Sequence, residues 1–586
     1  MYVRCNPNKK NVKYLSYVRG YRDKNGISKQ ITVEKIGDWE DLIKIYDDPI
    51  KHFNDIANDR EKELLLNNEL IIKTNEILSD DFSPLNLGYI ILKKIYNELK
   101  IKNFLNDKQN NLNINYKLND ILELLIYSRV LYPGSKLDTY NNKESFFDNF
   151  DFSLKDLYRS LDYFNSYKDE ILTLIWNNTK DKYNRDTSIS YYDCTNYYFE
   201  ISYNDEDLLD EFGNIIEKGY RKKGPSKEHR KTPIIQLGLL MDNKGIPLSY
   251  DLFPGNESEK LQMRPSLKKT KAKFGIDRTI IVADRGQNTS DNTVFIAGKN
   301  DDAHINHDGY VYGQSIIGAD QEFKNWAINT NDFIIDKFIE DNTEITFKHK
   351  SRVYAKKVQI KKDDKRTVNY LIYQKQLVYY SQKYADKQKY ERELAIKKAE
   401  DLINNPGKYT QATSYGCTKY INNIKFDTKT GEIPEGLELS LKLDKIKEEE
   451  KYDGYYSIVT SEKYLSDKEI RDIYKGLWKI EESFKITKTN LETRPIYVWT
   501  KEHIEAHFLT CFISLVILRL LEQKIDKKYS TNQIINDLKK LTCTNINSDY
   551  FIINYRTPLI KDLELLFKLN FSEKFIKIQK IRKYLK

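Results

Sequence analysis

The stretch Arg278-Thr-Ile-Ile-Val-Ala-Asp284-Arg-Gly286 decides the fold: a short run of apolar residues ends on a carboxylate. Such a run, bounded by polar residues, predicts a short buried strand. Open α/β sheets place ligand sites beyond the carboxyl ends of their strands, so Asp284 is a candidate functional residue. A lone aspartate in this position is also a common turn or helix cap, and that alternative stays open.

Two β elements and a helix are predicted before this strand. Residues 188–201 are rich in β-forming residues and carry Asp193 within an apolar and aromatic run. Two apolar runs between 233 and 253 flank Asp242-Asn-Lys-Gly245, which predicts a hairpin. Apolar periodicity then predicts a helix over 258–273. Strand, hairpin, helix and strand in this order indicate an α/β core rather than a helix bundle.

The periodicity of the apolar residues divides the whole chain into six expected segments. An Asn-Gly turn between alternating runs predicts an N-terminal hairpin, and helical spacing follows over 60–78, 88–105, 117–131 and 153–178. The segments are the hairpin (1–50), a helical region (51–182), the first part of the core (183–320), an insertion with strands and a helix over 382–404 (321–460), the second part of the core (461–525) and a basic helical C-terminal region (526–586).

Composition limits the class of protein. The chain has 96 basic and 87 acidic side chains, and the net charge of +9 permits a polyanionic partner without requiring one. Its five cysteines include no Cys-x-x-Cys pair, which argues against a disulfide framework or zinc finger and for a reducing compartment, the cytoplasm or nucleoid. The most apolar segment, 508–521, is too short to span a membrane and predicts a core helix, and the N-terminus lacks a secretory signal.

A third carboxylate, Glu481, lies on a helix predicted over 465–488. Trp478 and Phe484 flank it at three residues, so we expect this face to be half-buried; an i, i+4 pair with Lys485 is the simpler alternative. Buried carboxylates need a base or a metal, and oxygen-only ligands suit Mg²⁺ or Mn²⁺ rather than zinc. Two such ions can activate a nucleophile and stabilise the leaving oxygen of a phosphodiester.

Other chemistries have weaker support in the sequence. Of seven histidines, only His503 and His507 are spaced at i, i+4, and without a Glu-x-x-His frame they are expected to be core residues. Cys194 follows Asp193 in the strand and should face the opposite side, which argues against a nucleophilic role.

Together these motifs resemble the insertion-sequence-four-like DDE transposases, which have an RNase H-like catalytic domain. The family's helix signature is Tyr, two residues, Arg, three residues, Glu, six residues, Lys; residues 474–488 supply the Tyr, Glu and Lys in register. Tyr192-Asp193-Cys-Thr, Lys227-Glu-His-Arg230 and Val282-Ala-Asp284-Arg-Gly286 resemble the family's earlier motifs, so the likeness covers about residues 185–520. Leu477 departs from the signature Arg, and a leucine cannot make a charge-assisted phosphate contact, which leaves the family's DNA-hairpin step in doubt.

The resemblance implies a fold and an activity. The fold is α/β: an RNase H-like mixed sheet interrupted by a β-rich insertion, with a mostly helical N-terminal region that binds DNA ends and a helical C-terminus. The activity is cleavage at insertion-sequence ends and strand transfer into target DNA. The catalytic residues that would bind two Mg²⁺ (or Mn²⁺) ions are Asp193, Asp284 and Glu481. The DNA-binding residues would be Tyr474, Lys485, Lys488, Lys227, His229, Arg230 and Arg285.

The implied partners are the terminal inverted repeats and target DNA, both double-stranded, with a homodimer in the synaptic complex and no membrane. The basic loop 221–231 is a candidate DNA contact, although a solvated loop explains it nearly as well. Three rivals stay open: a plain nuclease of the same fold, an inactive DNA-binding protein, and a two-carboxylate glycosidase, which would need neither Mg²⁺ nor the helical Tyr/Glu/Lys set.

Overall fold

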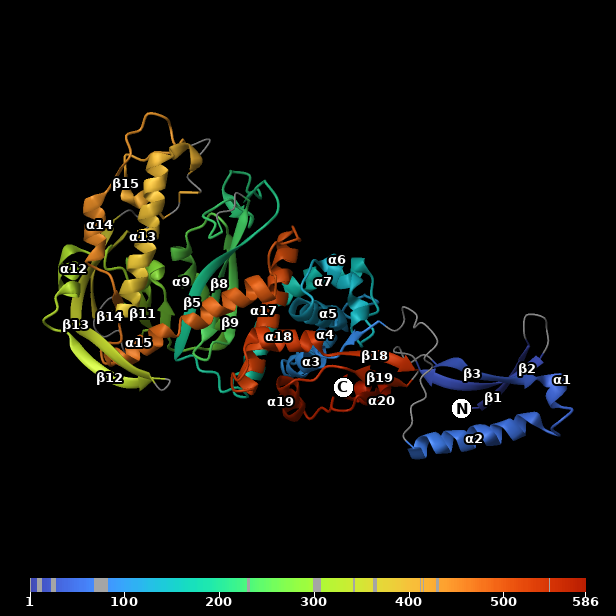
Figure 1. Ribbon diagram of the computed structural model, residues 1–586. Helices are drawn as coiled ribbons and strands as arrows, with labels where there is room; N and C mark the ends of the chain where they lie inside the picture. Colours follow the sequence, from blue (N-terminus) through green and yellow to red (C-terminus); the bar gives the residue numbers. More distant parts are fainter. Residues whose placement is uncertain are drawn as a thin grey trace. The chain divides into compact units, whose positions relative to one another are not determined.

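The computed structural model describes most of the chain in two compact units (Figure 1). The described residues are 2–7, 13–22, 28–67, 83–228, 232–298, 307–340, 343–361, 366–410, 413–414, 416–427, 432–547 and 549–585. Unit 1 comprises Met1–Lys168, Asn490–Glu492 and Ala506–Lys586, and unit 2 comprises Asp169–Thr489 and Thr493–Glu505.

Unit 1 begins with a small antiparallel sheet backed by a helix. Its elements are β1 (Tyr2–Pro7), β2 (Lys13–Arg22), β3 (Ser28–Asp38), α1 (Trp39–Leu42) and α2 (Pro49–Asn67). Strands β2 and β3 pair from Tyr14↔Asp38 to Arg22↔Ser28, which confirms the predicted N-terminal hairpin; its turn lies outside the described residues. Val3, Leu15, Tyr17 and Ala57 form the buried core between this sheet and α2.

The next part of unit 1 is helical, as predicted, but with more breaks. The helices are α3 (Tyr89–Glu98), α4 (Ile101–Gln109), α5 (Leu118–Leu131), α6 (Lys136–Asn141) and α7 (Leu154–Ser166), and α8 (Lys168–Thr179) leads into unit 2. The single helix predicted over 88–105 is two helices because Lys100 adopts a left-handed conformation (φ 60°) between them. Of the helix predicted over 60–78, residues 68–78 lie outside the described part of the chain.

The prediction of an entirely helical C-terminal region is wrong. Helices α18 (Thr531–Lys540), α19 (Pro558–Phe567) and α20 (Ile578–Leu585) alternate with β18 (Thr542–Asn547), β19 (Tyr550–Ile553) and β20 (Phe575–Lys577). With β4 (Leu85–Asn86) these strands form a sheet of order β20-β19-β18-β4. The sequence of β19, Tyr-Phe-Ile-Ile, consists of aromatic and β-branched residues that favour a strand.

Helix α17 (Lys501–Lys524) contains the most apolar stretch of the chain. It is long and apolar enough to cross a membrane by length and composition, and its most apolar window is completely buried in the structure. This burial confirms the prediction that the segment forms a core helix.

Unit 2 is built on one mixed sheet of order β12-β13-β14-β17-β11-β10-β5-β8-β9. The strands are β5 (Ile189–Tyr198), β8 (Ile234–Asp242), β9 (Pro247–Pro254), β10 (Ile280–Ala283), β11 (Gly309–Gln314), β12 (Ile334–Glu340), β13 (Thr343–Lys361), β14 (Thr367–Tyr380) and β17 (Tyr455–Thr460). Strand β10 is parallel to β5 and β11, and the other pairs are antiparallel. This confirms an α/β fold with the predicted strand, hairpin and return strand.

The helices of unit 2 flank the sheet, and the predicted helices over 258–273 and 382–404 are present as α9 and α13 (Figure 1). The helices are α9 (Glu259–Phe274), α10 (Ser290–Ala297), α12 (Gln321–Ile328), α13 (Gln382–Asn404), α14 (Leu443–Glu450), α15 (Asp467–Lys475) and α16 (Trp478–Lys485). Short strand pairs are β6 (Leu208–Leu209) with β7 (Ile215–Glu217), and β15 (Ile421–Asn422) with β16 (Ser440–Leu441). Within segment 321–460, strands β12, β13, β14 and β17 continue the main sheet, and only the short pair β15 and β16 stands apart from it among the described residues.

A buried ion pair holds the β8–β9 turn against the start of β5. Arg185 Nε donates to Asp242 Oδ2 at 2.7 Å, and the two side chains are 1% and 0% exposed. The Arg185 guanidinium also donates to the carbonyls of Ile246 and Pro247. Because all of its neighbours accept hydrogen bonds, the buried charge is fully compensated.

Candidate active site

Asp193 lies on β5, and Asp284 directly follows the neighbouring parallel strand β10. Strands β5 and β10 pair in the register Ile280↔Ile189 to Val282↔Tyr191. Two residues further along the same register, Asp284 falls beside Asp193. Adjacent strands are about 4.8 Å apart, so two carboxylates meet at the end of β10.

The environment of Asp193 favours the neutral carboxylic acid. The pKa of Asp193 is raised to about 7, chiefly by burial and also by the negative charge of Asp284, against the opposing effects of the Lys227 ammonium and the Cys194 backbone N–H. Two like charges in a partly desolvated site repel each other, so a cation shared by them would be bound strongly.

Asp284 is an exposed residue and also caps a turn. Its Oδ1 accepts a hydrogen bond from the Gly286 N–H at 2.9 Å, at the start of the short 3-10 helix Arg285–Gln287. The capping role considered for Asp284 from sequence is therefore real. One such bond occupies a single lone pair of the carboxylate and leaves the others for a ligand.

The helix segment that carries Tyr474, Glu481 and Lys488 packs along β5. At one end, a β-carbon at Gly476 would overlap the Tyr191 hydroxyl. At the other end, the Tyr197 hydroxyl and Thr487 Oγ1 form a hydrogen bond of 2.7 Å, in the π-helical turn Ile486–Asn490. Tyr191, Asp193 and Tyr197 alternate along β5 and share this face, so the helix covers the face that bears Asp193.

Glu481 is less enclosed than the sequence pattern predicts. Phe484 is buried (7% exposed), but Trp478 is 52% exposed and Glu481 itself is exposed, so the half-buried environment expected for Glu481 is wrong. The buried face of helix α16 consists of Ile480, Ser483 and Phe484. Glu481 is next to this face on the helix but is not part of it. Within the described chain, no ion pair joins Glu481 to Lys485.

Tyr474 lies between Asp284 and Glu481. The pKa of Tyr474 is raised to about 12, chiefly by burial and also by the charges of Asp284 and Glu481, against the opposing charge of Arg285. Its hydroxyl lies against Gly313 on β11, at a point where any β-carbon would clash with it. Both acids thus act on one hydroxyl, which places Glu481 on the same side of the sheet as the aspartate pair.

Lys488 and Lys227 supply positive charge on the other side of Asp193. The pKa of Lys488 is lowered to about 8, chiefly by burial and also by Lys227, against the opposing charges of Asp193 and Glu259. Lys227 Nζ donates to the Cys194 carbonyl at 2.6 Å and lies 3.4 Å from Glu259 Oε1. The sequence offered no signal for Glu259 beyond an acid in the first turn of a helix, where acids are common.

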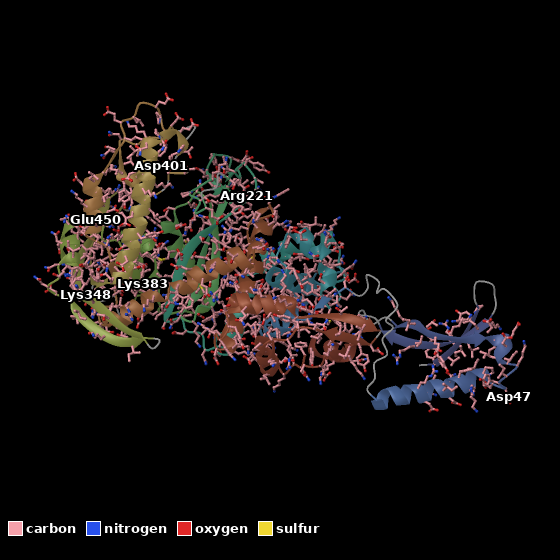
Figure 2. The ribbon with its side chains drawn as sticks, in the orientation of Figure 1. Asp47, Arg221, Lys348, Lys383, Asp401 and Glu450 are labelled. Carbon is pink, nitrogen blue, oxygen red and sulfur yellow. The ribbon has the colours of Figure 1, made fainter. Side chains whose placement is uncertain are left out.

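The remaining predicted DNA-binding residues fall into three groups. Lys485 and Arg285 are exposed beside the site, and His229 and Arg230 lie outside the described residues. In the basic loop, Arg221 pairs with Asp205 and Lys222 pairs with Asp207 at 2.8 Å; Arg221 is labelled in Figure 2. These two charges are offset by acids of the preceding loop, which reduces their attraction for a polyanion.

Leu477 and Cys194 are both buried, and the orientation predicted for Cys194 is confirmed. Leu477, at the position of the signature Arg, is 8% exposed and packs in the core of unit 2. Cys194 faces away from Asp193: its Sγ lies 3.2 Å from the Tyr192 hydroxyl and 3.4 Å from Gln262 Oε1 on α9. Burial raises the pKa of the Cys194 thiol well above its ordinary value, which leaves it unreactive.

The donor chemistry at the aspartate pair fits a hard divalent cation, although a complete ligand set is not assembled. Asp193 and Asp284 are adjacent oxygen donors with a shared, poorly compensated charge. Among the residues that the structure describes, no three His, Cys, Asp or Glu side chains are grouped closely enough to form a metal site, so Glu481 does not join the pair. Comparison with protein-family models and with curated proteins gives no match.

Proposed function

We propose that this chain is a transposase of the DDE type, which cleaves DNA at the ends of its element and joins them to target DNA in a metal-dependent reaction. The observation that carries the proposal is the pair of carboxylates formed by Asp193 on β5 and Asp284, which directly follows the neighbouring parallel strand β10. A carboxylic acid whose pKa is raised to about 7 by burial, with a smaller contribution from the charge of Asp284, is suited to a divalent cation.

The arrangement of the sheet supports an RNase H-like core. Strands β9, β8 and β5 form an antiparallel meander, and β10 and β11 follow in parallel on the other side of β5. Helix α9 connects the two halves. This order supports the proposal of an RNase H-like fold, and the motif resemblance that suggests it rests on the motifs quoted above, since the wider comparisons give no match.

The residues around the pair have distinct proposed roles. Asp193 and Asp284 would hold Mg²⁺, which when bound supplies a Lewis acid for the scissile phosphate and lowers the pKa of the attacking hydroxyl. Lys488, held beside Asp193, would contact the phosphate as a cation, and the Tyr474 hydroxyl would donate to a phosphate oxygen. Glu481, exposed on the same side, is free to turn toward the pair when DNA and metal bind.

The test uses duplexes taken from the two flanks of the DNA segment that encodes the chain. The purified protein is incubated with them and a target plasmid, with Mg²⁺ or EDTA. We expect cleaved ends and joined products with Mg²⁺ alone, loss of both in Asp284→Asn and Glu481→Gln, and retention in Glu482→Gln, the neighbouring acid on α16. Cleaved ends without joined products would identify a plain nuclease, and binding without cleavage an inactive DNA-binding protein.

A further inference from the structure

The β6–β7 hairpin, residues 206–217, displays an apolar surface in unit 2. Five large apolar side chains on it are half-exposed or more: Leu208 57%, Leu209 50%, Phe212 89%, Ile215 51% and Ile216 64%. Scattered single apolar residues are normal on a protein surface, but a contiguous group on one short element marks a contact site.

The hairpin turn has a fixed shape. Asp210 Oδ1 accepts hydrogen bonds from the backbone N–H groups of Phe212 (2.9 Å) and Asn214 (2.8 Å), and Asp210 Oδ2 accepts from the Asn214 side chain. Gly213 takes the left-handed conformation (φ 82°) that the turn requires. The apolar side chains are therefore presented by an ordered element, which lowers the entropic cost of binding.

The charge of the hairpin selects its partner. Residues 206–217 contain five acids and no lysine or arginine. Asp207 pairs with Lys222 and Glu217 pairs with Lys501, so the negative charge of the hairpin comes from Glu206, Asp210 and Glu211. A surface of this charge repels the phosphates of nucleic acids and of anionic membranes. The hairpin is complementary to a protein surface that has apolar residues at its centre and basic residues around them.

The same unit has such a surface on the outer strands of the main sheet. Val353 (58% exposed), Leu371 (46%) and Tyr373 (38%) share one face, because Ala355 pairs with Tyr373 and Lys357 pairs with Leu371 across β13 and β14. We call Val353, Ala355, Lys357, Leu371 and Tyr373 the β13–β14 face. The same alternation adds Lys361 to Lys357 on this face of β13, with no acid among residues 352–361, and Lys463 lies over the Tyr373 ring.

We propose that the β6–β7 hairpin of one chain docks on the β13–β14 face of a second copy. Both surfaces are exposed in one unit, so they do not cover each other within a chain. Their apolar centres match and their charges are opposite. A two-fold axis makes the contact twice, which brings the buried area toward the roughly 800 Å² per partner of stable interfaces. The contact is independent of the proposed chemistry.

The test measures the mass of the full chain in solution without DNA, by sedimentation or light scattering over a range of concentrations. We expect a dimer with a dissociation constant on the order of 10 µM or tighter. Phe212→Asp weakens it at least about tenfold, as loss of a central anchor does. Leu565→Asp, at a residue 80% exposed elsewhere in the chain, leaves it unchanged.

A charge exchange tests the pairing of the two surfaces. Glu211→Lys and Lys357→Glu each weaken the dimer, and the double variant recovers it. A chain that is monomeric at every concentration, or a dimer that none of these changes weakens, overturns the proposal. A monomer whose binding to duplex DNA or to anionic phosphatidylserine vesicles is weakened by Phe212→Asp overturns it as well, and assigns the hairpin to that partner.

Discussion

Asp284 follows β10 at the place where the β5–β10 register sets it beside Asp193, and its charge helps raise the pKa of Asp193 to about 7. Neither residue is conspicuous alone, since Asp284 caps a turn and Asp193 lies within a strand. The proximity of the two carboxylates gives this part of the sheet its chemistry, and it makes the charge state of the site sensitive to pH and cations.

Replacing Asp193 should stabilise the metal-free protein in a pH-dependent way. The folded pKa of Asp193, about 7, exceeds its ordinary value of 3.8, so ionisation favours the unfolded chain, and stability is lost as pH rises from about 4 to about 7. Asp193→Asn removes this loss. We compare the free energy of unfolding of this variant in EDTA with that of the wild type. The gain in stability should be about 2–4 kcal/mol larger near pH 8 than near pH 4. Denaturant titration at both pH values measures this; an equal difference at both contradicts it.

The alkaline limit of activity should follow Lys488. Burial and Lys227 lower the pKa of Lys488 to about 8, so its ammonium is lost as pH rises through that value. If the cation contacts DNA, the cleavage rate falls above about pH 8, and Lys488→Arg moves that limit to higher pH because a guanidinium stays charged. The matched control is Lys485→Arg, at an exposed lysine, for which the pH profile should not change. If Lys488→Arg leaves the pH profile of cleavage unchanged, Lys488 does not contact DNA as a cation.

Gly476 should be intolerant of any side chain. A β-carbon there would overlap the Tyr191 hydroxyl and ring, so Gly476→Ala pushes the Glu481-bearing helix away from β5. We expect a loss of about 1–3 kcal/mol of stability and a larger loss of cleavage activity. Gly407→Ala, where no atom lies within 4 Å, is the control. Thermal unfolding and cleavage assays on the two variants provide the measurement. Equal stability and activity of the two variants would contradict the close packing of Gly476 against Tyr191.

The buried pair Arg185–Asp242 should be essential to the core. Both side chains are 1% exposed or less, so Asp242→Asn leaves a desolvated guanidinium without its counter-charge. The expected cost is about 3–5 kcal/mol, against less than about 1 kcal/mol for Asp41→Asn, whose pair with Lys44 is 72% exposed. Denaturant midpoints of the two variants provide the measurement, and comparable midpoints would contradict the structural role.

Much of the fold was predictable because its signals are local. The Asp242–Gly245 turn between apolar runs predicts β8 and β9, and helical periodicity followed by Gly275 predicts α9. The aliphatic run before Asp284 predicts β10. Each of these elements follows from residues within a few positions of one another.

The C-terminal strands were missed despite local signals such as the Tyr-Phe-Ile-Ile of β19. Two other errors involve contacts that the local sequence does not reveal. Arg221 and Lys222 are basic in sequence, yet Asp205 and Asp207 offset their charges across a loop. Glu481 has apolar neighbours at the right spacing, but Trp478 faces solvent. Periodicity specifies that a helix has an apolar face and does not specify what covers each position of that face.

The most direct test of the central claim is metal-dependent cleavage by Asp284→Cys, measured with Mg²⁺ and with Mn²⁺. A thiolate is a poor ligand for Mg²⁺ and accepts the softer Mn²⁺, so a ligand role for Asp284 predicts a specific change of metal preference. The wild type should cleave DNA ends with either ion, and Asp284→Cys with Mn²⁺ alone. Full activity of the variant with Mg²⁺, or cleavage by the wild type in EDTA, would contradict a metal site at Asp193 and Asp284.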